Sequence, residues 1–319
     1  MKISSFVVLG DIMIDEYVFG DVTRISPEAP VPILNINKRE YFLGGAGNVF
    51  TSIQLLESKS TLIGIVNKKE DLNFLSERYR TRIDMIESLT RPTTLKSRFI
   101  SNNQQLLRVD REETRNIESL EIEEVMEKID RNSPSTIIIS DYNKGVISKN
   151  LISHIVKYSR KNNTKTIVDP KGLDYLKYQG VYCLKPNLKE FEGFVGKKII
   201  SENDLIREGR EFLKKMDLEL LIITLSSNGI VAFDKKGFCI GETKKSEIFD
   251  VTGAGDTVAA LSAFGIDNNW EMKKIVQLSN AAGSLAVSRF GTHSYNLQEI
   301  EKHYKNNQNE FRIRNSGTF

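Results

Sequence analysis

The stretch Asp250-Val251-Thr252-Gly253-Ala254-Gly255-Asp256 gives the first indication of how this chain folds. An apolar pair precedes it and a helix-like run from Thr257 to Phe264 follows it, so we expect a strand, a glycine turn and a helix start in succession. Free N–H groups in such a turn and the positive end of the helix dipole suit a phosphate anion. Gly253 and Gly255 permit the turn and the close approach of that anion.

Asp256, which closes the stretch, allows two interpretations. Its carboxylate would stand beside the anion and could accept a proton from an attacking hydroxyl. Phosphoryl transfer needs such a base together with positioning and charge stabilisation. Alternatively, Asp256 is only a helix N-cap and the glycines only make a tight turn. The rest of the chain has to decide between the two.

Short apolar runs alternate with longer helical patterns, which predicts parallel strands joined by crossover helices. The expected strands are Phe6–Leu9, Thr61–Val66, Thr136–Ser140, Thr166–Val168, Val181–Leu184, Leu220–Thr224 and Ile230–Phe233. The expected helices are Gly47–Leu56, Leu120–Ile129, Lys149–Lys161, Asn203–Met216, Thr257–Phe264 and Trp270–Arg289. Polar residues directly follow several strands, and ligands of open α/β sheets bind beyond the carboxyl ends of the strands. These polar residues therefore indicate a site.

Two regions, Tyr17–Asn37 and Thr93–Val109, break this rhythm with alternating apolar residues and predict a small separate sheet. Such a sheet could form a lid that excludes water from the crevice. We therefore expect one domain over residues 1–305, with lid segments at about 14–38 and 92–110. Residues 306–319 are expected to be a loose polar tail.

Composition narrows the class of protein. The 319 residues are 39% hydrophobic and 27% charged, which is typical of a soluble globular protein. A net charge of +3 with dispersed basic residues argues against nucleic acid as a partner. Cys183 and Cys239 lie in or beside apolar runs and suggest core packing in a reducing compartment. We see no signal peptide and no bilayer-spanning stretch, so we expect a cytoplasmic protein with no membrane partner.

Several motifs are absent from the sequence. There is no P-loop, and Val258 stands where a dinucleotide-binding Gly-x-Gly-x-x-Gly would need its third glycine. The three histidines lack metal-ligand spacing. These absences disfavour P-loop enzymes and place a dinucleotide oxidoreductase third among the alternatives.

A second glycine motif, Gly44-Gly45-Ala46-Gly47-Asn48, precedes the first by a long separation. With both motifs in this order, the chain resembles the ribokinase-like (PfkB) carbohydrate kinases over nearly its whole length. This resemblance implies a three-layer α/β/α fold with a mostly parallel central sheet and a small β-sheet lid. It also implies an ATP-dependent kinase that uses Mg²⁺ and acts on a small sugar.

Further motifs narrow the resemblance to the D-glycero-β-D-manno-heptose 7-phosphate kinase domain. They are Arg24-Ile25-Ser26-Pro27-Glu28-Ala29-Pro30, Asn103-Gln104-Gln105-Leu106, Ser140-Asp141-Tyr142, Val168-Asp169-Pro170-Lys171-Gly172 and Pro186-Asn187-Leu188-x-Glu190. Departures from the usual pattern are Gly47 in place of Ala and Asn143 in place of Gly. The resemblance implies phosphorylation of the anomeric hydroxyl to the 1,7-bisphosphate, in ADP-heptose and lipopolysaccharide precursor synthesis.

The resemblance also implies roles for residues on the sugar side. Asp256 would be the catalytic base, and the N–H groups of Gly253, Ala254 and Gly255 would form the anion hole. The implied sugar ligands are Asp15, Gly44, Gly45 and Asn48. A loop cap is the competing interpretation of Asp15. Cationic partners for a sugar phosphate would be Lys171 first, then Arg98, Arg108 and Lys144. A solvated surface charge is the alternative for each of these cations.

On the nucleotide side, Asn187 and Glu190 resemble the element that orients Mg²⁺, often through water. Their alternative interpretation is a helix start with an acidic first turn. The expected nucleotide-binding residues are Asn187, Thr224, Ser226, Gly229, Gly253, Gly255 and Asn280. Asp250 and Thr252 match the K⁺ ligands of some relatives, so K⁺ is an optional third cofactor.

Two other functions stay open at this point. One is a different sugar kinase of the same family, acting on ribose, fructose or a sugar phosphate. The other is a non-catalytic module that binds a sugar or a nucleotide. A lid with an exposed apolar face could also pair with its own copy, so we expect a homodimer formed through the lid. The sequence contains no His-x-Gly-His, so we expect no nucleotidyl transfer.

Overall fold

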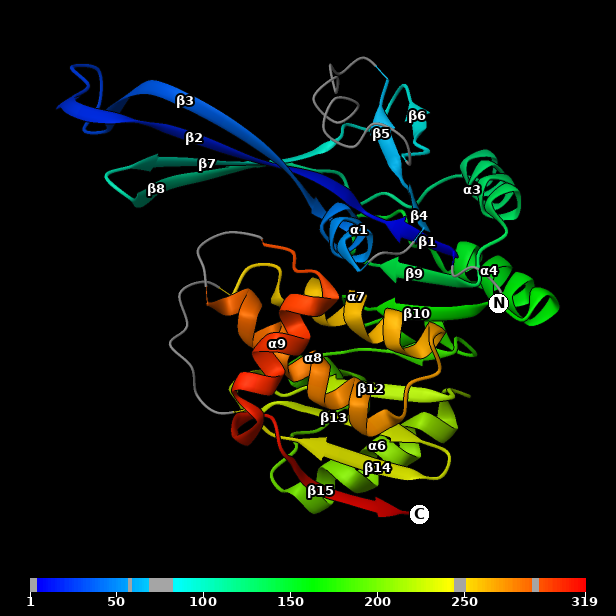
Figure 1. Cartoon of the computed structure of the whole chain (residues 1–319). Helices are drawn as coiled ribbons and strands as arrows, with labels where there is room; N and C mark the ends of the chain where they lie inside the picture. Colours follow the sequence, from blue (N-terminus) through cyan, green and yellow to red (C-terminus); the bar gives the residue numbers. More distant parts are fainter. Residues whose placement is uncertain (1–4, 57–58, 69–82, 244–250, 289–292) are drawn as a thin grey trace.

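The central sheet of this computed structural model has nine strands in the order β15-β14-β13-β12-β11-β10-β9-β1-β4 (Figure 1). The structure describes residues 5–56, 59–68, 83–243, 251–288 and 293–319. The strands are β1 (Ser5–Gly10), β4 (Lys59–Ile63), β9 (Thr136–Ser140), β10 (Lys165–Asp169), β11 (Cys183–Leu184), β12 (Leu220–Thr224), β13 (Ile230–Asp234), β14 (Gly237–Gly241) and β15 (Ile313–Thr318). The six strands from β4 to β12 run parallel, and β13, β14 and β15 are antiparallel to their neighbours.

Helices cover both faces of this sheet because its strands are apolar on both sides. In β1, Phe6 and Val8 belong to one buried cluster, and Val7 and Leu9 belong to the other. The first cluster is completed by α1 (Ala46–Leu55), α7 (Ala254–Asp267), α8 (Met272–Val287) and α9 (Leu297–Asn306). The second is completed by α3 (Ser119–Asn132), α4 (Lys149–Asn162), α5 (Leu188–Val195) and α6 (Glu202–Lys215). The predicted three-layer α/β/α fold is confirmed.

Short 3-10 helices lie in the connections: η1 (Tyr175–Tyr178), η2 (Ser226–Asn228) and η3 (Gln308–Glu310). Both cysteines are buried and free, as expected of core residues. No helix in the described part of the chain is both long enough and apolar enough to cross a bilayer.

A second sheet stands apart from the first, with the strand order β3-β2-β7-β8. Its strands are β2 (Ile12–Ile25), β3 (Pro32–Gly45), β7 (Thr94–Ser101) and β8 (Gln104–Arg111). Figure 1 shows the long β2–β3 hairpin extending away from the central sheet, with β7 and β8 beside it. The separate small sheet predicted from the sequence is therefore present, and we call it the lid sheet.

The sequence predicted one strand at Thr61–Val66, whereas the structure has β4 followed by β5 (Ile65–Asn67), which pairs with β6 (Ile86–Ser88) in a third sheet. The interruption falls at Gly64. A Cβ atom at Gly64 would lie 2.2 Å from Cδ1 of Ile12, at the start of β2. The lack of a side chain therefore lets the chain at Gly64 pack closely against Ile12.

The expected loose tail at 306–319 is corrected by the structure. Within it, β15 forms the edge of the central sheet and pairs with β14 in antiparallel register. The N–H of Phe319 extends the pairing by donating to the carbonyl of Lys236 at 3.0 Å. The tail is ordered because the backbone of β15 pairs with β14 and because Phe311, which is 1% exposed, packs into the core.

Candidate active site

Asp256 lies in the first turn of α7 and is 5% exposed. Gly253 is the N-cap, with φ of 78°, a conformation that glycine adopts without strain. The first helical backbone bond of α7 is the one from the N–H of Thr257 to the carbonyl of Gly253, at 2.9 Å. The N–H groups of Gly255 and Asp256 precede that bond and lie at the positive end of the helix, which suits an anion.

The carboxylate of Asp256 does not cap its own helix. Its Oδ2 accepts a hydrogen bond from Nδ2 of Asn48 at 2.7 Å, and its Oδ1 accepts one from the hydroxyl of Tyr142 at 2.8 Å. In the part of the chain that the structure describes, no lysine or arginine forms an ion pair with Asp256. The capping interpretation of Asp256 is therefore wrong, since both carboxylate oxygens are oriented by side chains from other elements.

Burial raises the pKa of Asp256 to about 6, and the nearby charge of Asp169 acts in the same direction. The hydrogen bonds from Asn48 and Tyr142 and the charge of Lys185 oppose this rise. A carboxylate with a pKa near 6 is deprotonated at neutral pH and is more basic than an ordinary aspartate. Both properties suit a general base.

Asp169 and Lys185 form a largely buried ion pair near Asp256. Asp169 ends β10 and Lys185 directly follows β11, and their side chains meet at 2.9 Å between Oδ1 and Nζ. The Lys185 side chain is only 4% exposed. Its Nζ lies 4.0 Å from the place that a Cβ atom of Gly255 would occupy, so the ammonium lies against the start of α7. A cation at that position can offset negative charge on a phosphate bound there.

Asp15 approaches from the lid sheet. It lies within β2, and its Oδ1 forms an ion pair with Arg98 of β7 at 2.5 Å. The loop-cap interpretation of Asp15 is therefore wrong. Gly44 of β3 faces Asp15 so closely that a Cβ atom would lie 2.2 Å from its Oδ2. The next residue, Gly45, has φ of 58° and turns the chain into α1, which carries Asn48.

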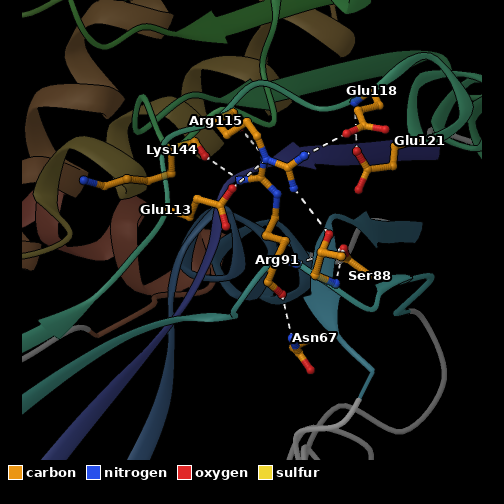
Figure 2. A network of polar contacts seen from close by, with 9 residues as sticks. Asn67, Ser88, Arg91, Glu113, Arg115, Glu118, Glu121 and Lys144 are labelled. Carbon is orange, nitrogen blue, oxygen red and sulfur yellow. Dashed lines mark hydrogen bonds and ion pairs between the residues drawn. The ribbon is translucent and has the colours of Figure 1, made fainter.

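The segment 142–146 carries Lys144 towards the lid and is anchored from two directions. The carboxylate of Asp11 accepts hydrogen bonds from the N–H groups of Tyr142, Lys144 and Val146 at 2.8, 3.1 and 3.1 Å. Arg91, which lies just before the lid strand β7, donates to the carbonyl of Lys144 at 2.8 Å (Figure 2). The same guanidinium donates to the carbonyl of Arg115, on the segment that leaves the lid. These bonds hold the segment 142–146 against the chain just before β7 and just after β8, where the lid sheet begins and ends.

A cavity of about 400 Å³ adjoins the start of α7. Its lining includes four of the expected nucleotide-binding residues, Thr224, Ser226, Gly229 and Asn280, and also Ala254 and Gly255. Gly229 has φ of 93°, and a Cβ atom there would lie 2.2 Å from the carbonyl oxygen of Gly241. Of the two expected K⁺ ligands, Asp250 lies outside the described residues and Thr252 lies in the turn before α7.

Comparison with known proteins agrees with this geometry. The family model described as pfkB family carbohydrate kinase matches residues 4–299. The chain belongs to this family. It is therefore an ATP-dependent sugar kinase.

The curated relatives of this pfkB family member include proteins named bifunctional protein HldE. That of Aliarcobacter butzleri is 38% identical over 97% of this chain and 67% of its own length. That of Nitratiruptor sp. is 38% identical over 93% of this chain and 64% of its own length. The chain thus spans about two thirds of the length of these relatives.

Solved structures of similar fold include Escherichia coli phosphofructokinase-2 in complex with potassium, with a TM-score of 0.80 and 18% identity. That match covers 96% of this chain and 99% of the other. Arabidopsis thaliana ribokinase complexed with ribose and ATP has a TM-score of 0.72 and 16% identity, covering 96% and 99%. At these identities the likeness concerns the fold alone.

The pfkB family implies Mg²⁺, and the pair Asn187 and Glu190 can be tested for it. The two residues form a capping box at the start of α5, so the helix-start interpretation describes a real contact. The remaining oxygen of Glu190 accepts from Lys171 at 2.7 Å. The described residues contain no group of three or more acidic or His/Cys side chains that could hold a metal. The side-chain oxygens of Asn187 and Glu190 suit a hydrated Mg²⁺ that is held mainly by ATP phosphates. Mg²⁺ usually binds in this way in kinases.

The four basic residues predicted to bind a sugar phosphate lie in two separate places in this kinase. Arg98, Arg108 and Lys144 lie on or beside the lid sheet, where Arg108 pairs with Asp110 and Lys144 pairs with Glu112, each at 2.7 Å. Lys171 instead lies beside Glu190 and acts on the pKa of Asp169. The structure therefore does not bring Lys171 together with the other three.

The sequence analysis gave no role to three side chains that the structure places at the site: Tyr142, Lys185 and Lys96. Tyr142 ends the motif Ser140-Asp141-Tyr142, and Lys185 directly precedes the motif that begins with Pro186-Asn187. The available signal was a polar residue close after a strand: Lys185 directly follows β11, and Tyr142 lies two residues after β9. Lys96 offered no signal, because its place depends on strand register.

Proposed function

We propose that this chain phosphorylates the anomeric hydroxyl of D-glycero-β-D-manno-heptose 7-phosphate to give the 1,7-bisphosphate. The observation that supports the chemistry is the state of Asp256. It is a buried carboxylate with a pKa of about 6 and, among the described residues, no ion pair. It lies at the start of a helix that adjoins the cavity of about 400 Å³. The HldE names of the relatives and the Arg-Ile-Ser-Pro-Glu-Ala-Pro motif at residues 24–30 support the heptose.

In the proposed reaction, Asp256 accepts the proton of the anomeric hydroxyl while that oxygen attacks the γ-phosphorus of ATP. The bond between this phosphorus and the bridging β,γ-oxygen breaks, and ADP leaves with the electron pair. The N–H groups at the start of α7 and the ammonium of Lys185 stabilise the charge on the transferred group. When bound, Mg²⁺ neutralises part of the phosphate charge. Asp256 then releases its proton to solvent.

On the sugar side, Asp15 would accept from sugar hydroxyls and Asn48 would donate to them, and Gly44 leaves room for the carboxylate of Asp15. Thr224, Ser226, Gly229 and Asn280 would surround the nucleotide. The product would be a precursor of ADP-heptose for lipopolysaccharide, made in the cytoplasm where ATP is present.

The test of this function is release of ADP over a panel of sugars. Heptose 7-phosphate is compared with heptose, ribose, fructose, fructose 6-phosphate and mannose 6-phosphate at equal concentrations. The proposal requires the highest kcat/KM for heptose 7-phosphate. Faster turnover of ribose or fructose contradicts the substrate, and binding of sugar and ATP without any ADP release contradicts the enzyme.

We also infer a K⁺ requirement and a homodimer. Asp250 and Thr252 support the first, as does the potassium complex of the E. coli neighbour. Replacing K⁺ with Na⁺ should lower kcat.

The lid sheet supports the homodimer, because it exposes apolar side chains, among them Ile25 at 60% and Leu107 at 57%. Sedimentation should give twice the mass of one chain, and Leu107→Lys should give a monomer.

A further inference from the structure

One face of the lid sheet carries a row of charged side chains whose positions follow from strand register. Asp15 of β2 is opposite Lys96 of β7, which is opposite Asp110 of β8. Two residues further along β7, Arg98 is opposite Arg108 of β8. Alternate residues of a strand point to the same face, so Lys96, Arg98 and Arg108 stand together on the face that carries Asp15.

This face borders the candidate active site. The charge of Lys144, whose carbonyl accepts from Arg91 (Figure 2) and whose N–H donates to Asp11, acts on Lys96. The charge of Asp15 acts on Lys96 and also on Tyr142, the residue that donates to the catalytic base. Asp15 is therefore near both the cationic face and Tyr142, whose hydroxyl donates to Asp256.

Lys96 differs from the other cations of this face. The nearest carboxylates are already paired: Asp15 with Arg98, and Asp110 with Arg108. Within the described ranges Lys96 itself has no ion pair. Its side chain is partly buried, and desolvation lowers its pKa despite the opposing charge of Asp15. A partly buried ammonium without a partner is destabilised until an anion binds beside it.

We propose that Lys96, flanked by Arg98 and Arg108, binds the phosphate that the sugar brings with it and so makes the kinase select phosphorylated sugars. This inference rests on the proposed function, in that it names the part of the same substrate that is remote from the reacting hydroxyl. Lys96 supplies a compact charge, and the two guanidinium groups supply the directed donors that suit phosphate oxygens. Lys171, paired with Glu190, takes no part in this subsite.

The experiment compares Lys96→Met, Lys96→Arg and the control Lys161→Met, which changes an exposed lysine of α4. Calorimetry measures the Kd of heptose 7-phosphate, of heptose without the phosphate, and of an ATP analogue. Lys96→Met should weaken heptose 7-phosphate by tenfold or more and leave the Kd of heptose and of the ATP analogue unchanged. Lys96→Arg should retain affinity within a few-fold, and Lys161→Met should match the wild type.

Equal weakening of heptose and heptose 7-phosphate, or no weakening of either, overturns the inference. Lys96→Met should also melt no lower than the wild type, because it removes a partly buried charge that lacks a partner; a large loss of stability would indicate a structural role instead. The sugar panel separates the two proposals. If another sugar phosphate is the best substrate, the heptose is wrong, and the same comparison with that sugar and its unphosphorylated form still decides the role of Lys96. If an unphosphorylated sugar is best, the inference is wrong while the kinase chemistry stands.

Discussion

The hydrogen bond from Tyr142 to Asp256 gives the sharpest quantitative prediction. The hydroxyl of Tyr142 donates to Oδ1 of Asp256 at 2.8 Å. Burial and the charge of Asp256 raise the pKa of Tyr142 well above its ordinary value, so this hydroxyl stays a donor throughout the working pH range. Tyr142→Phe removes that donor and leaves the bond from Asn48 to Oδ2 in place.

The size of the effect follows from the charge on the acceptor. A hydrogen bond to a charged group contributes about 1.5–3 kcal/mol, and one pKa unit corresponds to about 1.4 kcal/mol. Taking the lower end, loss of the Tyr142 bond should raise the pKa of Asp256 by about one unit, from about 6 to about 7. In the proposed mechanism the deprotonated form is the base, so we expect activity to be lost as pH falls through this pKa.

The assay is the pH dependence of kcat/KM, which reports groups of the free enzyme. The acidic limb of Tyr142→Phe should move about one unit to higher pH relative to the wild type. The control is Tyr178→Phe, because Tyr178 also donates to a buried aspartate, Asp141, but not to the base. An acidic limb that stays in place in Tyr142→Phe, or that moves equally in both variants, refutes the reasoning.

Three other variants give independent checks. Gly44→Ala should raise the KM for sugar by tenfold or more and leave the KM for ATP unchanged, because its Cβ would displace Asp15; Gly193→Ala, in α5 with only Leu173 nearby, should do neither. Glu190→Gln should raise the Mg²⁺ concentration needed for half-maximal rate without changing the KM for sugar, and Glu192→Gln, which loses a surface pair, should not. Asp256→Asn should become more stable relative to the wild type as pH rises. The raised pKa of Asp256 means that its stabilising contribution is complete below its ordinary pKa and is lost as pH rises through about 6, a change of as much as about 3 kcal/mol in the free energy of unfolding. A stability difference that is the same at about pH 4 and about pH 8 would contradict this.

Local pattern was enough to predict most of the central sheet. Strands such as Thr136–Ser140 are apolar on both sides, because they lie between two helical layers, and such runs are visible in a sequence. The edge strand β15 was mistaken for a loose tail because its pairing uses backbone groups that leave no apolar pattern. Helix α5 was not among the expected helices, although a helix start with an acidic first turn was the alternative interpretation of Asn187 and Glu190.

The site could be predicted only where a motif marks it. The glycine turn pointed to Asp256, and the N-terminal glycine motif pointed to Asn48; the structure brings these two side chains into contact at 2.7 Å. The hydrogen bond from Tyr142 depends on how β9 lies beside β1, and the place of Lys96 depends on the register between β2 and β7. Neither follows from residues that are close together in the sequence.

The central claim is that Asp256 takes the proton from the sugar hydroxyl. Its most direct test is Asp256→Asn, which keeps the shape of the side chain and its acceptor for Asn48 but removes the base. We expect kcat to fall by about 10³-fold while calorimetry gives wild-type Kd values for the sugar and an ATP analogue. Turnover within tenfold of the wild type would show that some other group is the base.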